Sequence, residues 1–127
     1  MNNAEGLAGF AYVLGSVLFT VYGQIIVKWQ VAKAGALPAA LSERVPFLLS
    51  LIFNPWILSG ILAGFFVLVC WLAAMTKFEL SYAYPFMSLA FVFVLILSAI
   101  LFHEPLTVAK VLGVLLIIAG ILVGSRG

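Results

Sequence analysis

Polar side chains recur at intervals of four residues in an otherwise apolar stretch near the amino terminus. They are Ser16, Thr20, Gln24 and Lys28, and on an α-helix this spacing places them on one face as a slanted stripe. A glutamine amide facing lipid would leave its hydrogen-bonding groups unsatisfied, so Gln24 should face protein or water. The stripe favours a polar cavity that ends in a cation and could bind an anionic group. Alternatively, the hydroxyls bond their own backbone and Lys28 extends its ammonium group to the membrane interface.

A second polar face is expected farther along the chain, where Ser81, Tyr84 and Ser88 follow one another at helical spacing. Pro85 lacks the amide donor that would bond the carbonyl of Ser81, so it frees a backbone acceptor. Such broken helices are tolerated at membrane depth where they line a cavity. We therefore expect Tyr84 and Ser88 to form part of a substrate surface, together with Ser81. Tyr82 fits that surface and an ordinary interface aromatic equally well.

The acidic residues exclude one class of mechanism. The sequence has no Asp, and its four Glu residues lie at or outside the ends of the apolar runs: Glu5, Glu43, Glu79 and Glu104. Proton-coupled exporters of cations usually keep a carboxylate inside a span, which argues against that activity here. Glu104 follows the single His, but no other His or Asp can complete a metal or catalytic site. We interpret Glu104 as a helix cap, and Glu79 and Pro85 as structural turn residues, and we expect neither cofactor nor catalysis.

The elements that must position these residues follow from composition. Of 127 residues, 66% are hydrophobic and 8% are charged, whereas globular proteins are about half apolar and about a quarter charged. The chain is therefore predicted to be an integral membrane protein. A spanning helix needs about 20 residues, and the apolar runs predict a single all-α domain over residues 1–127, a four-transmembrane-helix bundle. Its helices are expected at about 7–31, 55–76, 80–102 and 106–124.

The connections limit the topology. Residues 38–54 include an apolar part too short to cross, so they should lie at the interface or form a helical lead-in broken at Asn54-Pro55. Tight turns at 77–79 and 103–105 force neighbouring helices to be antiparallel. The positive-inside rule weakly places the first connection in the cytoplasm, which leaves dual insertion open. The basic residues counted for this rule are Lys28, Lys33, Arg44 and Lys110 on one side of the membrane and Lys77 and Arg126 on the other.

Small residues indicate close helix packing. Gly60 and Gly64 are one turn apart in the second span, and Gly113, Gly120 and Gly124 recur in the last one. Glycines let helix backbones approach closely, either inside the monomer or across a dimer. Because four helices are too few to enclose a large headgroup, we expect a homodimer or a heterodimer with a related four-helix subunit, with the last helix at the contact.

Several motifs resemble those of the four-helix branch of the drug/metabolite transporter superfamily, in order and spacing. They are Gly23-Gln24, the stretch from Ser81 to Ser88, the turn His103-Glu104-Pro105-Leu106, and the run from Gly113 to Gly120. The chain departs from the small multidrug resistance proteins, whose first-helix glutamate would fall at Thr20. It is more similar to the small subunits that flip aminoarabinose-phosphoundecaprenol across bacterial inner membranes.

This resemblance implies a multi-pass inner-membrane flippase subunit, not an enzyme, for a polyprenyl-phosphate-linked sugar. Its substrate groove would be lined by these residues: Thr20, Gln24, Lys28, Ser81, Tyr82, Tyr84 and Ser88. An anionic phosphate suits Lys28 rather than a buried carboxylate. An exporter of drugs, polyamines or metabolites is the alternative. A structural partner without transport is a third, but it leaves Gln24 and the broken helix unexplained. The net charge of +2 gives no reason to expect a nucleic-acid partner.

Overall fold

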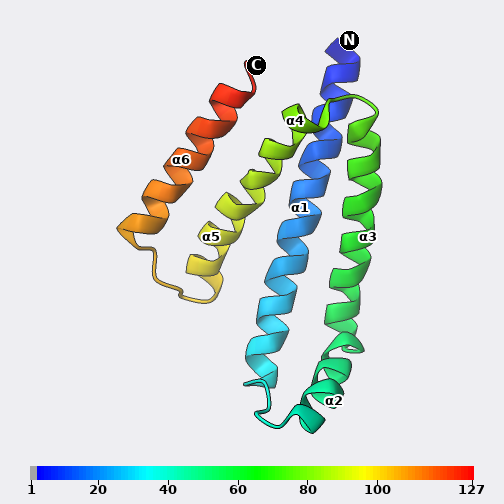
Figure 1. The fold of residues 1–127 in the computed structure, drawn as a ribbon, viewed down its shortest axis with the longest axis vertical. Coiled ribbons are helices and arrows are strands. Elements are labelled where there is room, and N and C mark those ends of the chain that lie inside the picture. Colours follow the sequence, from blue (N-terminus) through cyan, green and yellow to red (C-terminus); the bar gives the residue numbers. More distant parts are fainter. Residues whose placement is uncertain (1–2) are drawn as a thin grey trace.

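The computed structural model describes residues 3–127, and every regular element in that range is a helix (Figure 1). In chain order these are α1 (Asn3–Ala34), α2 (Leu41–Ile52), α3 (Pro55–Met75), α4 (Leu80–Ala83), the 3₁₀ helix η1 (Tyr84–Ser88), α5 (Leu89–Leu101) and α6 (Val108–Gly124). Three segments are long and apolar enough to cross a membrane: Asn3–Ala34, Pro55–Met75 and Leu80–Leu101. The prediction of a multi-pass membrane protein is confirmed. The apolar α6 has 17 residues, which span about 26 Å against a hydrocarbon core of about 30 Å.

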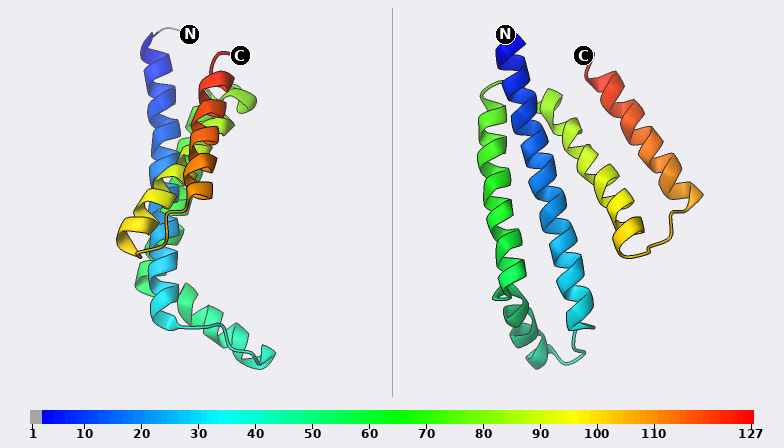
Figure 2. Two further views of the ribbon diagram at one scale, coloured as in Figure 1. Left: turned by 90° about the vertical axis from the view of Figure 1, so that its left-hand side faces the viewer. Right: turned by 180° about the vertical axis from the view of Figure 1, so that it is seen from behind.

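The long helix α1 is the centre of the molecule, with α3 packed along one side and α5 along another (Figure 2). It extends a few residues beyond the predicted range at both ends. Glu5 lies in its first turn and Lys33 in its last, where each charge complements the helix dipole. Gly35 ends the helix with φ +91°, a left-handed conformation that glycine adopts readily.

The α1–α3 contact depends on glycines. A Cβ added to Gly23 would lie 3.6 Å from the carbonyl oxygen of Gly60, and one added to Gly15 would lie 3.1 Å from the sulfur of Cys70. The two backbones therefore approach more closely than larger side chains would permit, which is how helices associate where no hydrophobic effect drives them together.

The third apolar segment is not one continuous α-helix. Pro85 lies in the first turn of η1, which separates α4 from α5. The position of the predicted break coincides with this 3₁₀ segment, because proline cannot supply the amide hydrogen that an α-helix requires there. Glu79 occupies the N-cap position of α4, although its side chain makes no capping hydrogen bond.

The connection between α1 and α3 folds into the short helix α2, which turns away from the bundle axis and has no buried residue (Figure 2). Asn54 ends this segment and caps α3, since its side-chain oxygen accepts the Trp56 amide hydrogen at 2.8 Å. Pro55 follows at the first position of α3, where a missing amide donor costs nothing. This geometry agrees with the predicted lead-in helix broken at Asn54-Pro55, and the location of the segment at the membrane interface stays a prediction.

The cap predicted for the last helix is wrong. Thr107, not Glu104, caps α6, because its hydroxyl accepts the Lys110 amide hydrogen at 3.2 Å. The chain first turns through His103, which has φ 54°, and α6 starts only at Val108. Glu104 is therefore too early to reach the free amides of the first turn. Both termini lie at the same end of the molecule (Figure 1).

Candidate substrate groove

A cavity of about 310 Å³ lies between α1 and α3 and contains the centre of the polar stripe. Thr20 and Gln24 contribute its polar side chains. The rest of the lining is apolar: Phe19, Gly23, Val27, Ile57, Gly60, Ile61, Gly64 and Val67. Gly64 has no neighbour within 4 Å of an added Cβ, so it keeps the groove open rather than holding the helices together. The structure thus places Gln24 against a cavity.

The stripe divides at Ser16, which lies outside this groove and is fully buried. Its hydroxyl is 3.1 Å from the carbonyl oxygen of Tyr12, one turn earlier, and 3.4 Å from that of Val67 on α3. For Ser16, the backbone-bonding alternative is the one that the structure supports. Its role is to join the two helices.

Lys28 stands at the far end of the stripe with 57% of its side chain exposed. Its ammonium nitrogen is 3.8 Å from Oε1 of Glu104, in the loop between α5 and α6. Nearby, the ammonium group of Lys110 donates to the carbonyl oxygen of Pro105 at 2.9 Å. The neutral polar groups of the groove are therefore followed by a charged group at its end.

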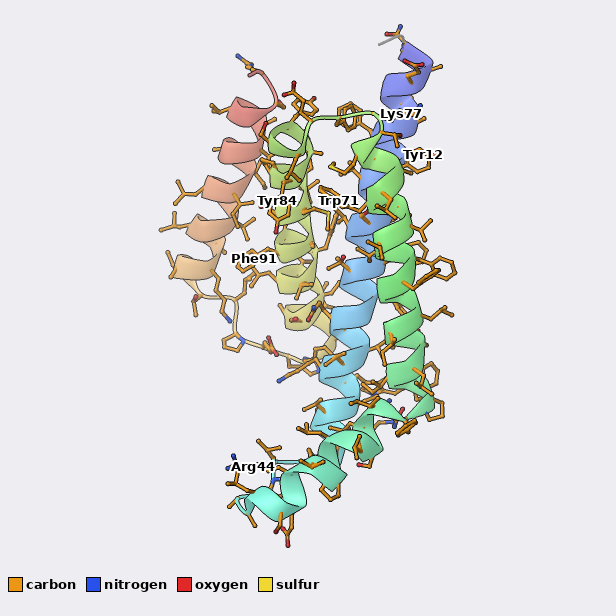
Figure 3. All side chains as sticks on the ribbon, turned by 45° about the vertical axis from the view of Figure 1, so that its right-hand side comes forward. Tyr12, Arg44, Trp71, Lys77, Tyr84 and Phe91 are labelled. Carbon is orange, nitrogen blue, oxygen red and sulfur yellow. The ribbon has the colours of Figure 1, made fainter. Side chains whose placement is uncertain are left out.

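Tyr84 projects from η1 towards α3, where its ring meets that of Trp71 edge to face at a centroid distance of 5.9 Å (Figure 3). Together with Ser81 it lines an open cavity of about 780 Å³, whose other residues are Glu79, Leu80 and Pro85. The sequence interpretation missed Trp71. Trp71 lies one helical turn after Val67, on the same face of α3 as Gly60 and Gly64, and this spacing could have identified it.

Two predicted substrate residues lie elsewhere. Tyr82 packs in an aromatic cluster with Phe10, Phe78 and Phe86, at centroid distances of 6.4, 5.3 and 5.6 Å. This cluster fixes α4 against α1, so Tyr82 is a packing residue in this conformation. Ser88 is half-buried at the end of η1 and lines neither of the two cavities described above.

A buried amide pair, also missed from the sequence, closes the other end of the α1–α3 contact. Asn54 donates from Nδ2 to Oε1 of Gln30 at 3.2 Å. Gln30 is 5% exposed, and its Nε2 has no hydrogen-bond partner within the described residues. The pair fixes the start of α3 against the last turns of α1, where an apolar pair would be less specific.

The arrangement can bind a polar, anionic molecule, and the groove between α1 and α3 has no acid in its lining, whereas Glu79 lines the separate cavity of Ser81 and Tyr84. All four carboxylates lie at helix ends or in a loop: Glu5, Glu43, Glu79 and Glu104. A groove of neutral hydrogen-bonding groups next to an exposed ammonium group suits sugar hydroxyls and a phosphate.

Comparisons with known proteins agree with this chemistry. The model of the EamA-like transporter family matches residues 6–126. The chain is 38% identical to the probable 4-amino-4-deoxy-L-arabinose-phosphoundecaprenol flippase subunit ArnF of Aeromonas hydrophila, covering 96% of this chain and 83% of that protein. It is 33% identical to the ArnF subunit of Photorhabdus laumondii, covering 94% of this chain and 98% of that protein.

The same comparison also finds a subunit with a different name. The chain is 31% identical to the probable flippase subunit ArnE of Pseudomonas aeruginosa, covering 91% of this chain and 96% of that protein. No solved structure matches the chain significantly.

Proposed function

The chain belongs to the EamA-like transporter family, and on this premise we propose that it is a flippase subunit for a polyprenyl-phosphate-linked sugar in the bacterial inner membrane. The observation that carries this proposal is the groove in which Thr20 and Gln24 face a cavity, with Lys28 beyond them as an exposed cation. Relatives of this chain are named as flippase subunits for a phosphoundecaprenol-linked sugar, and such a cargo presents both sugar hydroxyls and a phosphate to these groups.

In the proposed mechanism the sugar passes through the groove while the prenyl chain remains in lipid. The amide of Gln24 and the hydroxyls of Thr20 and Tyr84 replace hydrogen bonds that the sugar loses from water. Ser81 extends this surface beside Tyr84. Because these groups are uncharged, the sugar meets no strong binding site that would prevent its release.

Lys28 is placed to bind the phosphate at the membrane interface rather than at the bilayer centre. From Glu5 to Lys28, α1 rises about 35 Å, slightly more than a hydrocarbon core of about 30 Å. Trp29 and Trp56 meet next to Lys28 with ring centroids 5.2 Å apart, and Lys33 lies 4.2 Å above the Trp29 ring. Such aromatic and basic residues are typical of the headgroup layer, where the phosphate of a carrier lipid also lies.

The proposed assembly is a dimer, with another copy or with a related four-helix subunit, in which α6 crosses as the fourth span and contributes to the contact. Support comes from Gly113, Gly120 and Gly124, since a Cβ at any of them would have no neighbour within 4 Å. These glycines therefore do not serve packing in the monomer. Transporters commonly place their sites between related repeats, and this chain supplies one such unit.

The test is transport of the lipid-linked sugar in proteoliposomes by Lys28→Ala and Lys28→Glu variants. Both should reduce transport to background while expression and oligomeric state are kept, because the phosphate loses its cation or meets a like charge. Lys77→Ala, at the opposite end of the bundle, is the matched control and should remain active. Full activity of Lys28→Glu would overturn the proposal. If cells that express the protein resist soluble toxic cations but the protein does not transport the lipid-linked sugar, a small-solute exporter would be favoured instead.

A further inference from the structure

The contact between Lys28 and Glu104 is weak enough to be replaced. Its N–O distance is 3.8 Å, longer than the roughly 2.7–2.9 Å of a close charge-assisted hydrogen bond. The two side chains are 57% and 38% exposed, and exposed ion pairs contribute little stability. The pair nevertheless links α1 to the loop between α5 and α6, so its loss would remove one contact that holds that loop near the central helix.

The loop itself holds Glu104 in position. His103 adopts a left-handed conformation with φ 54°, which a residue other than glycine rarely takes. The amide groups of Phe102 and Glu104 both donate to the carbonyl oxygen of Ser98, at 3.0 and 3.4 Å. The carboxylate is therefore positioned by its own backbone turn, and Lys28 is not needed to keep it there.

An apolar cavity of about 280 Å³ lies next to this ion pair. It is lined by Ile25 and Trp29 of α1 and by Leu101 and Phe102 at the end of α5. Ile25 and Trp29 flank Lys28 along α1, one turn before it and one residue after it, and Phe102 precedes Glu104 by two residues. The cation and the apolar cavity thus share one stretch of α1 and one end of α5, and together they complement the phosphate and the first prenyl units of a carrier lipid.

We propose that the lipid phosphate displaces Glu104 from Lys28 while the adjoining prenyl units enter this cavity, and that the exchange releases the α5–α6 loop from α1. This inference rests on the proposed function, and it adds Glu104 as a residue that positions the α5–α6 loop before the lipid binds. The phosphate diester of a sugar-linked carrier lipid carries one negative charge, like the carboxylate that it replaces, and the monoester undecaprenyl phosphate carries about 1.5 to 2, so Lys28 keeps an anionic partner in either case. The displaced carboxylate, already partly exposed, passes into water.

The first experiment measures the distance between spin labels at Val31 and Leu106, in a Cys70→Ala background, in phosphatidylcholine nanodiscs. Undecaprenyl phosphate should shift the distribution to longer distances in the otherwise unchanged protein. Glu104→Gln should show the longer distances without lipid, and Glu43→Gln, which removes the same charge on α2, should not. Unchanged distances in Glu104→Gln would overturn the proposal.

Two further additions separate the possible sources of phosphate. Inorganic phosphate and phosphatidylglycerol should leave the distances unchanged, because neither brings a prenyl chain to the cavity. If either is as effective as undecaprenyl phosphate, the site recognises any anion and the role of the cavity is refuted. Leu101→Trp places a larger side chain in the cavity, at a residue that is itself exposed. It should weaken the response to undecaprenyl phosphate and leave the responses to the other two additions unchanged.

Binding of undecaprenyl phosphate, measured by native mass spectrometry, gives an independent test. Glu104→Gln removes a competitor for Lys28 and should bind about two- to fivefold more tightly, as expected for loss of an exposed pair, whereas Lys28→Gln should bind more weakly. Equal affinity of Glu104→Gln and the parent protein would contradict the exchange. If the parent protein shows these responses but does not transport the lipid-linked sugar, the proposed function fails and the exchange at Lys28 remains.

Discussion

The α1–α3 contact and the surface of α6 use the same residue type for different purposes. Along α1, an added Cβ at Gly9, Gly15 or Gly23 would meet atoms of the chain within 4 Å, and at Gly9 it would come within 2.7 Å of the Phe78 ring. Along α6, an added Cβ at its glycines would meet nothing within that distance. The sequence pattern is similar in the two regions, but only the structure shows which glycines already have a partner in the chain.

The two regions also differ in burial. α1 has buried residues along its whole length, whereas Ile121 is the buried residue of α6. Helix α6 packs mainly on η1 and α5 at the edge of the molecule (Figure 1). An apolar surface is normal in lipid, but a surface of small residues offers another helix a close approach. The difference separates a folding contact from a candidate assembly contact.

The largest expected effect is on the folding contact. Gly60→Leu should destabilise the monomer by about 1–3 kcal/mol, the range for overpacking, because the added Cβ already lies in contact with the Gly23 backbone, 3.8 Å from its Cα, so the atoms beyond it must part the two helices or turn into the groove. Thermal unfolding in detergent provides the measurement. Gly64→Leu, one turn later and facing the groove, is the control and should change stability by no more than about 0.5 kcal/mol. Equal losses of stability in Gly60→Leu and Gly64→Leu would show that the glycine with a helix partner matters no more to folding than the glycine without one.

The next effect concerns the assembly contact. Gly120→Leu should dissociate the oligomer and lower transport together, while helicity and monomer stability are kept, because the side chain has space in the monomer. Single-molecule photobleaching in nanodiscs measures the subunit number. Ala119→Leu adds comparable bulk about 100° around the helix and should leave the oligomer intact. Unfolding of Gly120→Leu would mean that these glycines pack inside the monomer, and a fully active monomer would exclude the dimer.

Sequence reasoning succeeded where the determinants are local. Apolar runs identify the long helices, and the broken segment follows from Pro85 because proline lacks an amide hydrogen. Contacts that depend on a distant partner are beyond its reach. Tyr82 is held by Phe10, on another helix, and no local pattern records that contact. Glu104 was predicted to cap α6 because a carboxylate at the amino end complements the helix dipole, but the turn at His103 shifts the helix start to Val108.

A smaller and selective effect is expected in the groove beside the folding contact. Gln24→Leu should lower transport about fivefold and leave the oligomer intact, whereas Gly120→Leu on α6 is expected to lose both together. The magnitude corresponds to a lost hydrogen bond worth about 1 kcal/mol. Ser16→Ala is the control on the same stripe, since the Ser16 hydroxyl bonds backbone carbonyls outside the groove. A transport loss in Ser16→Ala as large as in Gln24→Leu would show that the stripe acts through helix packing.

The smallest effect is expected at Glu79, which belongs to neither helix surface. It holds the N-cap position of α4 without a side-chain hydrogen bond, so Glu79→Gln should cost only the interaction of its charge with the helix end, about 0.3–1 kcal/mol. Transport should change less than twofold at each pH, a limit that corresponds to about 0.4 kcal/mol, and the shape of the pH profile should be kept. The physical reason is that the groove between α1 and α3 contains neutral polar groups, so proton exchange on a carboxylate has no place in the transport step. Rates measured in proteoliposomes across the neutral pH range provide the test. If a well-folded Glu79→Gln protein lost proton-driven transport, Glu79 at the start of α4 would carry the proton coupling. The interpretation that transport needs no carboxylate would then be wrong.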